Sequence, residues 1–139
     1  MEISFERRIT ALPETVFAYF TESEKYARWM GVGASLDPVP GGEFQVTNRD
    51  GSITRGAFVE IDPPRRLVFT WGFDGNPDVP PGSTIVTVTL RHEDGETLLK
   101  LVHSGLPSEH WATMHETGWT KYLDRLAIAG RGDDPGPDV

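Results

Sequence analysis

Residues 108–129, SEHWATMHETGWTKYLDRLAIA, are the stretch of sequence that decides the fold. Their larger apolar side chains recur at steps of three and four, the spacing that gathers side chains on one face of a helix. Ser108 is suited to cap the start of this helix, and Gly130 to end it. We therefore predict a long amphipathic helix over residues 108–129, with an inward face made of Trp111, His115, Gly118, Trp119, Tyr122, Leu123 and Leu126.

The sequence before this helix is typical of β-strands. Turn-forming residues separate runs that alternate in polarity or are rich in β-branched side chains, so we expect hairpins and an antiparallel sheet. Two short helices interrupt the strands: Pro13 opens one, and the second ends at Gly31 and Gly33. The predicted strands cover residues 2–11, 43–47, 53–61, 66–71, 84–92 and 96–104.

This order predicts an α+β fold with a curved antiparallel sheet of about six strands, two short helices and a long C-terminal helix over an apolar cavity. The long helix is the one large element free to cover the apolar face of the sheet. We assign residues 1–129 to a single domain and expect residues 130–139, rich in Asp, Pro and Gly, to be a disordered acidic tail. Residues 72–83 are expected to form an exposed loop that contacts a partner or acts as a lid.

Composition narrows the classes of function. The 139 residues include 13 basic and 21 acidic side chains, and the net charge of −8 disfavours nucleic-acid binding. There is no cysteine, so disulfides and thiolate chemistry are excluded. No apolar run suits a signal peptide or a membrane span, and we expect a cytoplasmic protein without membrane contact.

Large aromatic side chains gather on the predicted inner faces of the sheet and helices. Rigid rings that line a curved sheet leave gaps, which predicts a cavity for an apolar or aromatic ligand. A fully packed core is the alternative interpretation, because the same rings bury much apolar area. The candidate cavity residues are Phe17, Phe20, Trp29, Phe44, Phe69, Trp71, Leu101, His103, His115, Trp119 and Tyr122.

Two histidines and one arginine are the polar candidates near this cavity. His103 and His115 are expected to point inward, as polar anchors, as general acid–base groups or as hydrogen-bonded core residues. Arg7 is in phase with the apolar residues of the first strand. It would select an anionic ligand, form a structural ion pair with Glu43 or Glu60 as candidate partner, or lie at a solvated strand end. The histidine spacing does not suit a metal site, and we expect neither a metal nor a cofactor.

Several short motifs, in this order, resemble the family of homologues of the activator of heat-shock-protein-90 ATPase, within the START-like or SRPBCC superfamily. The resemblance covers roughly residues 2–127. It implies the helix-grip fold, in which a sheet grips the C-terminal helix and a cavity lies between them. The motifs are Ala11, Pro13, Val16-Phe17, Trp29, Gly56, residues 60–64 (EIDPP), 67–71 (LVFTW), 87–90 (TVTL) and 103–106 (HSGL), and then His115, Gly118-Trp119, Leu123 and Leu126.

The resemblance also ranks the hypotheses for function. Members of the superfamily bind lipids, steroids, polyketides or hormones, which favours a binding protein for a small apolar or aromatic ligand. The first alternative is a module that binds a chaperone or another protein, although the eukaryotic namesake carries an additional N-terminal domain. The second alternative is a cyclase-like or hydrolase-like enzyme that uses the cavity histidines. A monomer and a homodimer are both compatible with the sequence.

Overall fold

Seven strands and three helices make up the structure, a computed structural model that describes residues 1–139 in full. All six strand pairs are antiparallel: five join strands that are consecutive in the chain, and the sixth joins the first strand to the last. In chain order the elements are β1 (Ile3–Ile9), α1 (Pro13–Thr21), α2 (Ser23–Tyr26), β2 (Gly33–Leu36), β3 (Glu43–Thr47), β4 (Ile53–Asp62), β5 (Arg66–Trp71), β6 (Thr84–Glu93), β7 (Glu96–Ser104) and α3 (Glu109–Gly130).

The predicted α+β architecture is confirmed, with one strand more than the sequence indicated. The order of strands in the sheet is β1-β7-β6-β5-β4-β3-β2. The additional strand is β2, an edge strand in which Ala34 pairs with Val46 and Leu36 with Phe44 of β3. The four residues of β2 show no clear alternation in polarity, and Gly33 indicates the end of a helix rather than a strand. The strand therefore forms because it pairs with β3, not because of local preference.

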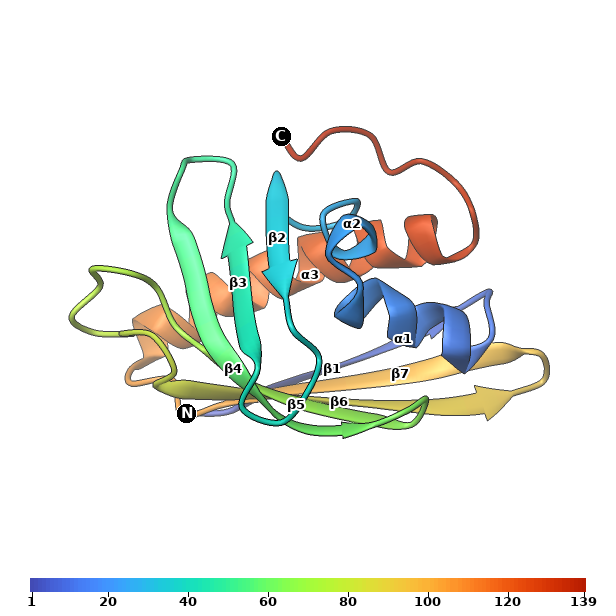
Figure 1. The fold of residues 1–139 in the computed structure, drawn as a ribbon, viewed down its shortest axis with the longest axis horizontal. Coiled ribbons are helices and arrows are strands. Elements are labelled where there is room, and N and C mark those ends of the chain that lie inside the picture. Colours follow the sequence, from blue (N-terminus) through green and yellow to red (C-terminus); the bar gives the residue numbers. More distant parts are fainter.

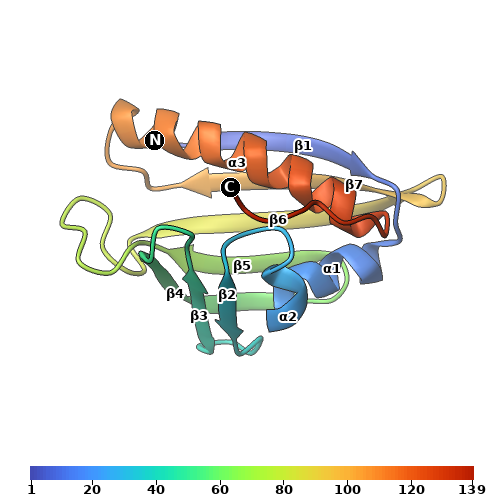
Figure 2. The same ribbon diagram turned by 90° about the horizontal axis from the view of Figure 1, so that it is seen from above.

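The sheet bends around α3, as Figures 1 and 2 show. Strands β1 and β5–β7 form the floor, whereas β2, β3 and the start of β4 turn away from it and rise beside the helix (Figure 1). A β-bulge in β4 places Phe58 opposite Phe69 and Glu60 opposite Val68, which leaves Val59 as the extra residue. Bulges increase the local bend and twist of a strand. The curvature therefore originates in β4.

A close approach of two backbones lies beside this bulge. A Cβ atom at Gly56 of β4 would lie 1.9 Å from the carbonyl oxygen of Thr70 in β5. The Thr70 hydroxyl accepts a hydrogen bond from the Ala57 amide at 2.9 Å and replaces a regular ladder contact. Only glycine fits where the strands are this close.

The core lies between α3 and the concave face of the sheet, and α1 and α2 close its far end (Figure 2). Trp29 is fully buried there, and its indole Nε1 donates a hydrogen bond to the carbonyl of Tyr19 at 2.9 Å. Phe44 stacks on Phe69 with ring centroids 4.3 Å apart. These rings fill the space under the second half of α3.

The ends of α3 agree with the sequence pattern. Ser108 is the N-cap, and its hydroxyl accepts a hydrogen bond from the Trp111 amide at 3.4 Å.

None of the three helices combines the length and apolar character that crossing a bilayer requires.

We predict that Gly56→Ala destabilises the protein by about 1–3 kcal/mol, because the new methyl group must push β4 away from β5. Gly33→Ala is the matched control: it also adds one methyl group to a strand glycine, but nothing lies within 4 Å of that position. We expect the control to change stability by less than about 0.5 kcal/mol. Urea unfolding of both variants checks this, and equal losses would show that the close approach has no energetic consequence.

Candidate functional site

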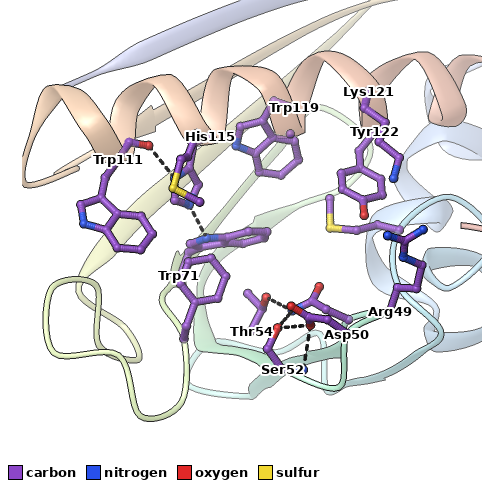
Figure 3. A pocket seen from close by; sticks show the side chains of 15 residues that line it. Arg49, Asp50, Ser52, Thr54, Trp71, Trp111, His115, Trp119, Lys121 and Tyr122 are labelled. Atoms are coloured by element: carbon purple, nitrogen blue, oxygen red, sulfur yellow. Dashed lines mark hydrogen bonds between the residues drawn. The ribbon is translucent and has the colours of Figure 1, made fainter. Parts of the chain in front are cut away.

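A cleft of about 310 Å³ lies between the first half of α3 and the turn that joins β3 to β4 (Figure 3). Trp71, on β5, lies between the helix and the turn, and Phe73 follows it along the chain. The side chains that line the cleft are Met30, Asn48, Arg49, Asp50, Ser52, Thr54, Trp71, Phe73, Trp111, Met114, His115, Gly118, Trp119, Lys121 and Tyr122.

The structure divides the eleven cavity candidates from the sequence into two groups. Trp71, His115, Trp119 and Tyr122 line the cleft. The other seven pack behind it, where aromatic rings meet one another: Phe17, Phe20, Trp29, Phe44, Phe69, Leu101 and His103. Part of the space under α3 is therefore packed by side chains, and part of it is the cleft.

Sequence reasoning missed the polar wall of the cleft. Residues 48–51 form turn chemistry between the predicted strands 43–47 and 53–61, and only the curvature of the sheet brings this turn opposite α3. Asp50 accepts hydrogen bonds from the amide and the hydroxyl of Ser52, at 2.9 and 2.6 Å, and these bonds lower the pKa of Asp50. The available signal was the Asn-Arg-Asp-Gly composition of the turn, which indicates a turn but not its neighbour.

The predicted loop at residues 72–83 closes one end of the cleft. Phe73 of this loop lines the cleft, and Val79 is fully buried. The indole Nε1 of Trp111, in the first turn of α3, donates a hydrogen bond to Asp78 of the loop at 3.3 Å. The loop is therefore attached to the helix in this structure.

His115 accepts a hydrogen bond inside the protein. The Trp71 indole Nε1 donates to His115 Nε2 at 3.2 Å, and His115 Nδ1 lies 2.8 Å from the Trp111 carbonyl oxygen. An indole N–H can only donate and a carbonyl can only accept, so Nε2 must be bare and Nδ1 must carry the proton. This pattern describes a neutral imidazole.

His103, on β7, has the mirror-image arrangement. Its Nδ1 accepts from the Trp119 indole Nε1 at 3.0 Å, and its Nε2 lies 2.8 Å from the Thr84 hydroxyl. That hydroxyl donates to the Trp71 carbonyl oxygen at 2.8 Å, so it must accept from the imidazole Nε2–H. The predicted inward orientation of both histidines is what the structure shows.

The surroundings keep both imidazoles neutral. Burial, and secondarily the neighbouring His115, lowers the pKa of His103 to about 3. Burial also lowers the pKa of His115, and its bond to the Trp111 carbonyl only partly opposes this. All four ring nitrogens are hydrogen-bonded, so proton transfer by either histidine would require breaking one of these bonds. The geometry therefore favours a structural role over acid–base catalysis.

Arg7 lies outside the cleft. Its guanidinium Nε pairs with Asp124 of α3 at 3.3 Å. The partners expected from the sequence are wrong: Glu43 pairs with Arg55, and Glu60 pairs with Arg66. The reason is topology, because β1 is one edge of the sheet and β3 and β4 lie toward the other edge.

The last nine residues, 131–139, here called the tail, run back along α3 (Figure 2), and the disorder expected for residues 130–139 stays a prediction. Asp138 is only 8 % exposed. Its carboxylate accepts hydrogen bonds from Tyr122 Oη at 2.8 Å, Lys121 Nζ at 2.8 Å and the Gly31 amide at 3.0 Å. These contacts are polar, so a search for apolar patterns could not detect them.

These contacts also shift two ionisation equilibria. Burial alone would raise the pKa of Asp138, but the donors Lys121, Tyr122 and Gly31 outweigh it and lower the pKa. Burial, together with the bond to Asp138, raises the pKa of Tyr122 to about 12. At neutral pH the pair is thus a carboxylate and a protonated phenol.

No group of three or more His, Asp or Glu side chains is placed to hold a metal ion.

A curved antiparallel sheet that grips a long C-terminal helix defines a helix-grip protein of the START-like superfamily. The profile of the family described as "Activator of Hsp90 ATPase homolog 1-like protein" matches residues 10–129. The chain belongs to this family.

Solved structures agree with this assignment. An AHSA1-like protein from Rhizobium etli is 44% identical, with 99% of this chain and 86% of that chain covered and a TM-score of 0.79. An HSP90 activator from Plasmodium falciparum is 26% identical, with 93% and 95% covered and a TM-score of 0.76. DynU16, a protein of the dynemicin biosynthetic locus, is 26% identical, with 96% and 49% covered and a TM-score of 0.80. No curated protein sequence matches the chain significantly.

We predict that the free energy of unfolding falls as the pH decreases from about 6.5 toward 3. In this range His103 and His115 are protonated in the unfolded chain, whereas their lowered pKa values keep them neutral in the native protein. For His103 the loss between pH 7 and pH 5 is about 2 kcal/mol. His103→Gln should remove this part of the pH dependence, and urea unfolding at the two pH values measures it. The same substitution at the exposed His92 is the control and should leave the wild-type pH dependence. An unchanged pH dependence in His103→Gln would contradict the assignment.

Proposed function

We propose that this protein binds a small apolar or aromatic molecule in the cleft under the first half of α3. The observation that carries the proposal is Gly118, a glycine in the interior of α3 that lines the cleft. Glycine inside a helix costs about 1 kcal/mol relative to alanine. Nothing lies within 4 Å of the position that a Cβ atom would occupy, so packing does not require a glycine here. An absent side chain keeps the cleft open.

The chemistry of the walls supports an aromatic ligand. Trp71, Phe73 and Trp111 offer ring faces and edges, and Met114 is a flexible side chain with half of its surface exposed. Aromatic rings and methionine favour flat apolar partners. A volume of about 310 Å³ is near the lower end for small-molecule sites, which suits a molecule of one or two rings.

The relatives are compatible with such a role. DynU16, which is 26% identical to this chain, is a protein of a biosynthetic locus. The two neutral histidines, whose ring nitrogens are all hydrogen-bonded, favour binding over a cyclase-like or hydrolase-like activity.

The four tryptophans provide a direct test by NMR. We expect bicyclic aromatic probes to shift the indole N–H signals of Trp71 and Trp111, which line the cleft. The Trp29 indole is bonded to Tyr19 in the core outside the cleft and should not move. Saturation at one probe per chain supports the site. A broad apolar panel that shifts none of the signals, or shifts Trp29 equally, would disprove it.

Filling the position of Gly118 should block the cleft. We predict that Gly118→Leu weakens probe binding at least tenfold, because the new side chain occupies the ligand's volume. Thr117→Leu places the same side chain at the exposed neighbouring position and should bind as the wild type does. Gly118→Ala should raise stability by about 0.5–1 kcal/mol. Equal binding by Gly118→Leu and Thr117→Leu would contradict this use of the cleft.

A second candidate function is an interaction with a chaperone. It is favoured by the similarity to the Plasmodium falciparum HSP90 activator, which covers 95% of that solved chain. If this function holds, adding the protein to an Hsp90 should raise the rate of ATP hydrolysis, measured by phosphate release. An acidic protein of equal size that does not bind Hsp90 is the control, and an unchanged rate at saturating protein would exclude the function for that Hsp90.

A further inference from the structure

Asp138 of the tail occupies a site that is built by distant parts of the chain. The three donors to its carboxylate are the Gly31 amide, which precedes β2, and the Lys121 and Tyr122 side chains on α3. The Asp138 side chain is 2% exposed, so its charge is held almost entirely by these groups. Charged groups are rarely buried unless they are paired and hydrogen-bonded.

One of the three donors, the Gly31 amide, is fixed in place without the tail. Gly31 has a φ of +77°, and a Cβ atom there would lie 2.6 Å from the Thr47 carbonyl oxygen, so its backbone is locked against β3. The Lys121 and Tyr122 side chains extend from α3, and their hydrogen bonds go to the tail itself. This arrangement matches what recognition of a carboxylate requires, with one cation and two neutral donors.

Two of these three donors also lie at one end of the aromatic cleft. Lys121, Tyr122 and Met30, the residue before Gly31, all line the cleft. Figure 3 shows Arg49 and Lys121 at the end of the cleft where Tyr122 lies. In a chain with a net charge of −8, these two cations favour an anionic ligand at this end of the cleft, whose lining contains one carboxylate, Asp50.

The tail itself is held by polar contacts, which include a bond from Lys121 Nζ to the Val139 carbonyl at 3.1 Å. Besides Asp138, its main attachment is Arg125, whose guanidinium donates to the carbonyls of Pro135, Gly136 and Pro137 at 3.1, 2.9 and 3.2 Å. A space of about 650 Å³ lies between the tail and the elements below it, so the tail does not pack closely on them. Segments with few buried apolar contacts open at low free-energy cost.

We propose that the donors around Asp138 form a carboxylate-binding site at the end of the cleft, and that Asp138 competes there with the carboxylate of an aromatic ligand. The inference rests on the proposed function and narrows its ligand to aromatic carboxylates. The rings lie among Trp71, Trp111 and Trp119, and the acid group bonds to Tyr122 and Lys121. Binding releases the tail from α3.

The test compares 2-naphthoate with its neutral amide, 2-naphthamide, on the full chain, with the indole signals of Trp71 and Trp111 as the readout. Asp138→Ala should bind 2-naphthoate about tenfold more tightly than the wild type, because the competing carboxylate is gone. The affinity for 2-naphthamide should change by less than about twofold. Asp133→Ala removes an equal charge from an exposed tail residue and should behave as the wild type. Asp138→Asn repeats the test if Asp138→Ala lowers the melting temperature.

Adding Tyr122→Phe to Asp138→Ala removes one donor and should abolish most of the gain for 2-naphthoate. The Gly31 amide signal is a second readout: it should shift in Asp138→Ala and shift again when 2-naphthoate binds. If both probes bind but Asp138→Ala affects them equally, the carboxylate site is disproved while the cleft function stands. If neither probe binds to any variant, the cleft function fails, and this inference fails with it.

Discussion

The reciprocal hydrogen bonds between α3 and the sheet are the constraint on which the rest of this structure depends. The sheet supplies a donor, Trp71, and an acceptor, His103, and the helix supplies the matching acceptor, His115, and donor, Trp119. Each pair is buried, so a rotation or a shift of the helix would leave polar atoms without partners, at about 1–3 kcal/mol each. Apolar packing brings helix and sheet together, and these two bonds select one relative position.

This relative position also determines where the cleft lies. Trp71 and Trp119 point toward the histidines, and their rings line the cleft, which lies on the side of the β3–β4 turn. On the other side the stack of Phe44 on Phe69 fills the interior. The helix-grip fold of the family thus encloses a small open cleft here, next to a solid aromatic core. Its size favours compact ligands.

The sequence was sufficient for the fold because its strongest pattern, the apolar stripe of residues 108–129, required a broad surface to cover. It identified His115 as inward-facing for the same reason, and His103 because it shares a strand face with Leu99 and Leu101. It could not divide the aromatic residues into core and cleft. Phe44 and Trp71 have the same inward periodicity, but only Trp71 lines the cleft, which depends on the bend of the sheet. The polar contacts of Asp138 bridge distant segments, and no local pattern encodes them.

The short strand β2 has a consequence for the behaviour of the protein at high concentration. Without it, β3 would be an edge of the sheet and would offer a row of free amides and carbonyls beside Phe44 and Val46. Such edges recruit strands from other molecules and start aggregation. β2 covers that edge and replaces it with four residues, too few to template a long intermolecular ladder. The strand β2, which the sequence pattern did not predict, therefore protects the folded chain from aggregation through this edge.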